Sequence, residues 1–134
     1  MKELIYEIIA TAGTIEEAGA RILKPFGLTP MTFNILNVLK DGPLSQRQIG
    51  EKVIVVASSV TFQVRHLQRR GLIQRRRADA RTWNVSLTPL GAQTRAAAEK
   101  QMDAVISQIE VDPALVAGTK AALKAIQAHL PAVS

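Results

Sequence analysis

The sequence of 134 residues contains no cysteine, which excludes disulfides, thiolate catalysis and cysteine-based redox sensing. Histidine is also scarce, because the chain has two, His66 and His129, and neither has a metal-site partner nearby in sequence. We therefore expect no metal site and no cofactor. No nucleophile–base pair and no carboxylate constellation stands out, so the sequence does not predict an enzyme.

Long apolar runs are missing as well. No run approaches the ~18 residues that a membrane span needs. The N-terminus lacks the basic, apolar and small-residue order of a signal peptide, so we expect a cytoplasmic protein without a membrane partner. Hydrophobic residues nevertheless make up 47% of the chain, which argues against disorder. The length predicts a single domain over residues 1–134 with a real core.

The net charge of +6 is concentrated in the middle of the chain. Residues 43–82 hold nine basic and two acidic side chains, whereas residues 1–42 carry −1 and residues 83–134 carry no net charge. Six arginines fall within the thirteen residues from Arg69 to Arg81. A solvated basic surface is one interpretation, but concentration in one segment favours a polyanionic partner.

Helix start signals recur along the sequence. Thr29-Pro30, Thr88-Pro89 and Asp112-Pro113 each place an N-cap acceptor before a proline at the first helical position. A further start is predicted at Ser45, where Ser45 and Gln48 form a capping-box pair. With the apolar periodicity, these signals predict helices over residues 2–24, 30–40, from 45 onward, 58–70, 89–111 and 113–130.

The helix predicted over residues 58–70 has a clear inward side. Val60, Val64 and Leu67 recur at helical spacing, and Gly71 follows as a left-handed stop. The residues that we expect to face outward or flank that face are Ser58, Ser59, Thr61, Phe62, Arg65, His66 and Arg69. Two alternatives stay open: Phe62 either meets a thymine methyl or packs against a neighbouring helix, and Arg69 and Arg70 either contact a ligand or complement the helix C-terminus.

A basic β-hairpin follows this helix. Leu72-Ile73 opens one strand, and Trp83, Val85 and Leu87 alternate with polar residues in the other, with Trp83 expected in the hairpin core. The charged residues around the turn are Arg75, Arg76, Arg77, Asp79 and Arg81. A helix–turn–helix followed by a basic hairpin is the layout of a winged helix, which can place its second helix in the major groove of DNA and its wing on phosphates.

The segment "GLIQRRRADARTWNVSLTPLG", residues 71–91, resembles the wing of MarR-type (multiple antibiotic resistance regulator) transcription factors. The matching motifs are Gly71-Leu72-Ile73, Asp79-x-Arg81 and Leu87-Thr88-x-x-Gly91. The resemblance implies a homodimer that reads a palindromic site, a wing with Arg81 held in place by Asp79, and a small phenolic or aromatic effector. It also implies a bacterial or archaeal protein associated with the nucleoid.

Some positions depart from the family pattern: Ile54 stands where a small residue is usual, Val56 where a capping Ser or Thr is usual, and Phe62 replaces a polar residue.

The fold class that we predict is mainly α with a small β-hairpin wing: a winged helix-turn-helix core over residues 28–88, with dimerisation helices at 1–24 and 89–130. The helices at both ends carry apolar stripes that a partner subunit would bury, although a self-contained bundle is the alternative. The predicted function is a sequence-specific, ligand-responsive DNA-binding repressor of transcription that partners double-stranded DNA and a small aromatic or apolar acid. The alternative is a winged-helix module for RNA binding or protein assembly.

Overall fold

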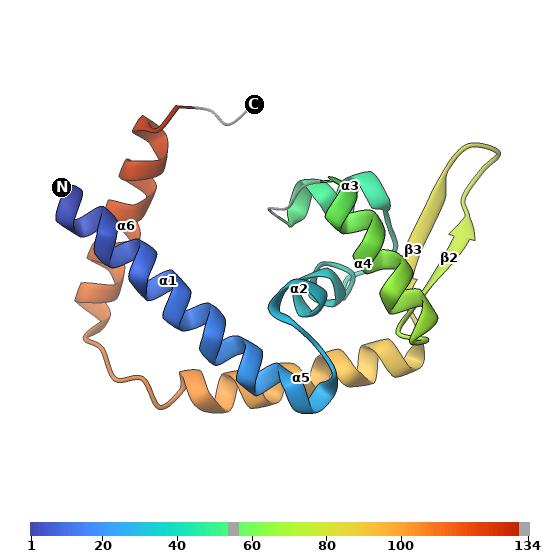
Figure 1. The fold of residues 1–134 in the computed structure, drawn as a ribbon, viewed down its shortest axis with the longest axis horizontal. Helices are drawn as coiled ribbons and strands as arrows, with labels where there is room; N and C mark the ends of the chain where they lie inside the picture. The colour runs from blue at the N-terminus through green and yellow to red at the C-terminus, as the bar shows by residue number, and fades with distance from the viewer. Residues whose placement is uncertain (54–56, 132–134) are drawn as a thin grey trace. The chain divides into compact units, whose positions relative to one another are not determined.

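The computed structural model describes residues 1–53 and 57–131, without the side chains of Ala57 and Ser58 (Figure 1). The departures from the family pattern at Ile54 and Val56 lie outside the described residues. The chain divides into two compact units, Met1–Asp103 and Ala104–Ser134, and each is described by itself.

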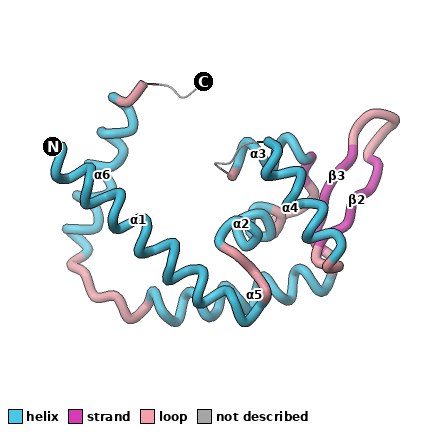
Figure 2. The backbone as a smooth tube through the Cα atoms, viewed as in Figure 1, coloured by secondary structure: helices cyan, strands magenta, loops and turns pink. Residues whose placement is uncertain are grey.

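The first unit is mostly helical with a small sheet, as predicted. Its elements are α1 (Lys2–Leu23), a 3-10 turn η1 (Lys24–Phe26), α2 (Pro30–Val38), β1 (Leu44–Ser45), α3 (Gln46–Lys52), α4 (Ala57–Arg69), β2 (Ile73–Arg77), β3 (Trp83–Leu87) and most of α5 (Pro89–Ile106). The second unit contains the end of α5 and α6 (Pro113–His129). Figure 2 shows the strands β2 and β3 as a long hairpin joined by one loop.

The predicted helix starts are confirmed by their capping hydrogen bonds. Thr29 and Thr32 form a reciprocal capping box at the start of α2. Asp112 accepts a hydrogen bond from the backbone of Ala114 at the start of α6. The Thr88 hydroxyl accepts from the backbone N–H of Gly91 at 3.0 Å. In each case the side chain satisfies an N–H that the first helical turn leaves without a partner.

The core of the first unit lies between α2, α3, α4 and the base of the hairpin. Val60, Val64 and Leu67 of α4 are all buried, which confirms the inward side predicted from helical spacing. They share the core with Ile49 of α3 and Val85 of β3. Because α4 is held along one whole side, its opposite side is presented in a fixed orientation.

The sheet has one strand more than the sequence predicted. The strand order is β1-β3-β2, all antiparallel, and β1 contributes only Leu44 and Ser45, which pair with Val85 and Asn84. Two residues are too short a segment to show any periodicity. The helix predicted over residues 89–111 is also shorter than expected, because α5 ends at Ile106 and turn-type bonds such as Gln108 N–H to the Val105 carbonyl replace the helical ones.

A polar junction joins the end of α4, the base of the hairpin and the start of α5. The Thr88 hydroxyl donates to the carbonyl of Gly71 at 2.6 Å, and the Thr88 N–H donates to the carbonyl of Leu72 at 3.1 Å. Gly71 has φ of 74°, a left-handed conformation that favours glycine. Gly91 passes so close to Leu72 that a Cβ there would overlap the Leu72 carbonyl group. The Gly71-Leu72 and Thr88-x-x-Gly91 motifs are therefore two halves of one contact.

We expect Gly91→Ala to lower the free energy of unfolding by about 3 kcal/mol, because the added methyl group would meet rigid backbone. Urea unfolding followed by circular dichroism measures the change. Gly13→Ala is the matched control: nothing lies within 4 Å of the added Cβ, so the control should gain about 0.5–1 kcal/mol from the lower backbone entropy cost. Equal midpoints for Gly91→Ala and the wild type would contradict the close approach.

Candidate nucleic-acid interface

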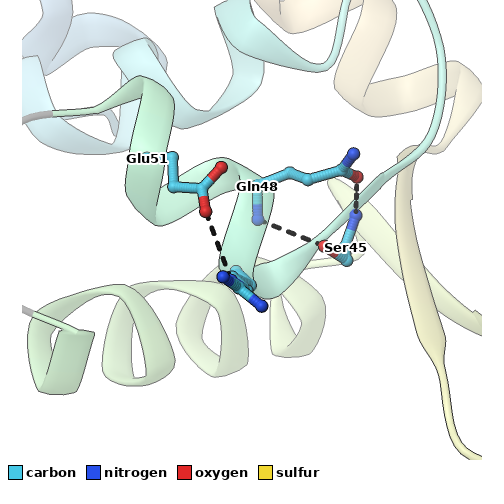
Figure 3. Close-up of polar contacts among 4 residues, drawn as sticks. Ser45, Gln48 and Glu51 are labelled. Atoms are coloured by element: carbon cyan, nitrogen blue, oxygen red, sulfur yellow. Dashed lines mark hydrogen bonds and ion pairs between the residues drawn. The ribbon is translucent and has the colours of Figure 1, made fainter.

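The helix pair α3–α4 is set by a local cap at the start of α3. The Ser45 hydroxyl accepts from the Gln48 N–H at 3.1 Å, and the Gln48 side chain accepts from the Ser45 N–H at 2.9 Å (Figure 3). This reciprocal pair confirms the predicted capping box. On the exposed side of the same helix, Arg47 forms an ion pair with Glu51 at 3.2 Å.

The outward side of α4 carries the residues that helical counting placed there. Phe62 is 62% exposed, and Arg65 and Arg69 are exposed, whereas Ser59, Thr61 and His66 are half-buried. Phe62 therefore does not pack against a neighbouring helix, and the interpretation that faces it outward holds within this chain. Ser58 belongs to α4, but its side chain lies outside the described residues.

One contact on α4 was not predicted. The Gln46 side chain donates to the Thr61 hydroxyl at 2.6 Å, so Thr61 ties the start of α3 to α4. Gln46 is the first residue of α3, and its neighbour Ser45 draws attention as the cap, so no sequence pattern marked it. The bond adds a polar contact between the two helices to the apolar packing of Ile49 and Val60.

Arg70 has a structural role rather than an outward one. Its guanidinium donates to the carbonyls of Phe26 and Gly27, at the end of η1. Gly27 has φ of 68°, and its left-handed turn directs the chain toward α2. The alternative that Arg70 complements the C-terminus of its own helix is therefore wrong, because the carbonyls that it binds belong to a distant turn.

The tip of the wing is a turn organised by Asp79. Its carboxylate accepts hydrogen bonds from the backbone N–H groups of Arg81, at 2.8 Å, and Thr82, at 2.9 Å. The bond from Arg81, which has the larger effect, and the bond from Thr82 together hold the pKa of the Asp79 carboxyl below its ordinary value. Arg77 donates to the carbonyl of Ala80 at 3.2 Å. The backbone of Arg81 is thus held by Asp79 while its side chain is exposed.

Trp83 is not in the hairpin core, contrary to the prediction. It is 42% exposed, and the guanidinium groups of Arg75 and Arg77 lie over its ring. The inward face of the hairpin is buried only near its base, at Ile73 and Val85. Further toward the tip, the same face extends beyond the helices, so the residue there stays in contact with solvent. Arg76 lies on the other face of β2 and is exposed.

The described residues hold no group of three or more His, Cys, Asp or Glu side chains arranged to bind a metal ion. Among the helices in residues 1–53 and 57–131, none combines the length and the apolar character needed to cross a membrane.

We expect Asp79→Ala to loosen the wing turn without unfolding the core, because the two hydrogen bonds at Asp79 are local. Amide hydrogen exchange at Arg81 and Thr82 should become faster, while the amides of Val64 and Leu67 keep their protection. In the wild type the same two amides should lose protection as the pH falls through the lowered pKa of Asp79, since protonation weakens the acceptor. Unchanged exchange in Asp79→Ala would mean that other contacts hold the turn.

Comparisons with known proteins agree with this architecture. A family model described as "MarR family" matches residues 26–81, which contain α2, α3, α4 and the first part of the wing. YwoH of Bacillus subtilis (strain 168), an HTH-type transcriptional regulator, is 32% identical over 79 residues. The match covers 58% of this chain and 58% of YwoH, so it spans somewhat more than half of that relative.

Two solved structures extend the similarity to nearly the whole chain. Sco5413 of Streptomyces coelicolor, a MarR family transcriptional regulator, is 26% identical with a TM-score of 0.83, over 95% of this chain and 92% of that one. MepR of S. aureus, solved as a complex with DNA, is 23% identical with a TM-score of 0.78, over 93% and 96% of the two chains. Its identity is low enough that it supports the fold alone. The predicted winged-helix fold is confirmed by these structures, and residues 26–81 of the chain match the model of the MarR family.

Proposed function

We propose that this chain is a DNA-binding transcriptional regulator that acts as a homodimer on a palindromic operator. In this proposal the winged helix-turn-helix core of residues 28–88 contacts DNA, and residues 1–24 and 89–130 form the dimer. Regulation by a small-molecule effector, most simply as a repressor that the effector releases, completes the proposal.

The observation that carries the proposal is where the positive charge lies. The basic excess of residues 43–82 is on the outward side of α4 and on the wing, two neighbouring parts of one unit. Arg65 and Arg69 are exposed on α4, and Arg76, Arg77 and Arg81 are exposed on the hairpin. Like charges so close together repel one another, and an anion bound against them would offset the cost of that repulsion. A helix flanked by a basic wing fits a duplex, with α4 in the major groove and the wing on the backbone or minor groove.

The fold supports the same conclusion. MepR, whose structure was solved with DNA bound, shares the fold over nearly the full length of both chains. The residues proposed here for base contacts are those on the outward side of α4, with Phe62 available to a thymine methyl group and Arg65 to a guanine edge. Those proposed for the backbone or minor groove are the wing arginines.

Exposed apolar residues on the helices at both ends support a homodimer. On α1, Ile9 is 63% and Ile15 is 66% exposed, and on α6, Leu115 is 63% and Val116 is 52% exposed. Contiguous apolar side chains of this size are rarely left in water by a monomeric protein. A second copy would bury them and would set two α4 helices at the separation that a palindrome requires, about 34 Å for one helical turn of DNA.

We expect Ile15→Glu to convert the dimer into a monomer, because a carboxylate would be buried among the apolar residues of α1 that the partner is proposed to cover. Sedimentation velocity measures the change in mass. Ala10→Glu is the matched control: it adds the same charge to the opposite side of α1, near Glu3 and Glu17, and should leave the dimer intact. If both variants sediment like the wild type, the α1 stripe is not part of the interface.

The expected effector, a small aromatic or apolar acid, finds one matching feature in the second unit. A hollow of about 420 Å³ is lined by Val111, Val116, Thr119, Lys120 and Leu123. Its wall is almost entirely apolar and includes one lysine, Lys120, a combination that suits an apolar body with a carboxylate.

Because the chain has no cysteine, release from DNA by peroxide through thiol oxidation is not expected.

Two arginine variants separate base reading from backbone contact. Arg65→Ala should weaken operator binding by about 1–3 kcal/mol and change non-specific binding little, because Arg65 lies on the helix proposed for the major groove. Arg81→Ala should weaken binding to operator and scrambled duplex alike and reduce the salt slope by about 1, because it removes one backbone or minor-groove contact. Titration of both duplexes at several salt concentrations measures both effects.

The same titration separates the proposed function from its alternative. A winged-helix module for RNA or protein assembly would bind duplexes weakly, without preference for sequence. Equal losses of affinity on both duplexes for Arg65→Ala would mean that Arg65 contacts phosphate only and that another residue on α4 reads the bases. If neither variant loses affinity for either duplex, the proposal that this chain binds DNA is wrong.

A further inference from the structure

The wing has one face on which an aromatic ring and two arginines come together. In the register of the hairpin, Arg77 is directly opposite Trp83, and Arg75 is opposite Val85, the next residue on the same face of β3. The guanidinium carbons of Arg75 and Arg77 lie 5.2 Å and 5.1 Å from the centre of the Trp83 ring. Both distances are within the range of a cation–π contact. We call Arg75, Arg77 and Trp83 the stacked triplet.

The two arginines need this ring for different reasons. The Nε atom of Arg75 is buried and has no hydrogen-bond partner, so the electron-rich ring is the group that can offset its lost hydration. Arg77 is exposed and also donates to the carbonyl of Ala80, so its side chain is held from two directions. A long arginine side chain that is held in this way loses less conformational entropy when it binds an anion.

The position of Trp83 buries only part of its side chain, so hydrophobic burial there contributes little to stability. Trp83 is 42% exposed, so much of its surface stays in water, and the buried part of the hairpin ends at Val85. A leucine or valine would serve an edge position of this kind as well. What tryptophan adds is a flat ring with a negative face, and of the aromatic side chains it binds cations best.

We propose that Trp83 is a positioning residue of the wing, which holds Arg75 and Arg77 side by side so that their guanidinium groups meet DNA phosphates without prior ordering. The inference rests on the proposed function, since it assumes that the wing contacts DNA. It assigns to Trp83 an indirect role, through the arginines, rather than a contact of its own with a base or sugar.

The first experiment tests the stacked triplet in the free protein. Trp83 is the single tryptophan of the chain, so tryptophan fluorescence, excited selectively over that of Tyr6, reports on the wing alone. Arg75→Gln and Arg77→Gln should each uncover part of the ring and increase its quenching by acrylamide. Arg76→Gln, on the other face of β2, is the matched control and should leave the quenching unchanged. Equal quenching in all three variants and the wild type would overturn the triplet.

The second experiment measures DNA affinity and its salt dependence for Trp83→Leu in three backgrounds. In the wild type and in Arg76→Gln, the loss of the ring should weaken binding about fivefold and reduce the salt slope by about 1–2, because two phosphate contacts are disturbed. In the Arg75→Gln/Arg77→Gln background it should change affinity less than twofold, because the arginines through which Trp83 acts are gone. Trp83→Phe keeps an aromatic face and should recover most of the affinity.

The outcomes separate the possible failures. A similar loss in all three backgrounds would mean that Trp83 contacts DNA directly or supports the hairpin in general, and would overturn the positioning role. No loss in any background would overturn it too. If the wild type binds neither operator nor scrambled duplex, the proposed function fails, and the inference fails with it even where the quenching result confirms the triplet.

Discussion

The contact between Thr88 and the Gly71-Leu72 segment determines how the parts of this chain that are proposed to bind DNA are held together. Two hydrogen bonds from Thr88 satisfy the carbonyls at which α4 ends and β2 begins, and the same threonine caps α5. Gly91 lets the first turn of α5 lie directly on the Leu72 backbone. Helix α4, the wing and α5 therefore meet at one rigid point, so the outward side of α4 and the wing keep a constant relation to each other.

The arginines concentrated between residues 43 and 82 make different kinds of contact in the folded chain. Arg70 stabilises a turn by binding carbonyls, Arg47 pairs with Glu51, and Arg75 and Arg77 pack against Trp83. Arg65 and Arg81 are exposed on α4 and on the wing, the two parts of the chain proposed to contact DNA. A count of charges overstates the number of groups available to a ligand, because Arg47 and Arg70 are already bound to a carboxylate and to backbone carbonyls of the protein. The proposed function depends on position and exposure rather than on the total.

The apolar residues that remain exposed divide between the two proposed activities. On α1 and α6, exposed isoleucine, leucine and valine side chains form stripes, which is the arrangement expected where a second copy packs. On α4, Phe62 stands alone among polar and basic neighbours. A single aromatic residue cannot form a stable protein interface, but it can add an apolar contact to a polar one, as with a thymine methyl group.

The sequence by itself determined whatever depends on near neighbours in the chain. The Ser45–Gln48 cap, the proline-marked helix starts and the inward side of α4 all arise within a few residues, so local rules predict them. The role of Asp79 in holding the wing turn came from the family resemblance of the motif Asp79-x-Arg81. Tertiary structure decided the rest. Strand β1 exists only because Leu44 and Ser45 meet β3, Arg70 binds a turn more than forty residues away, and Trp83 is exposed because the hairpin extends past the helices that would have covered it. These outcomes depend on which surfaces far apart in the sequence come into contact, and the spacing of residues along the chain does not predict those contacts.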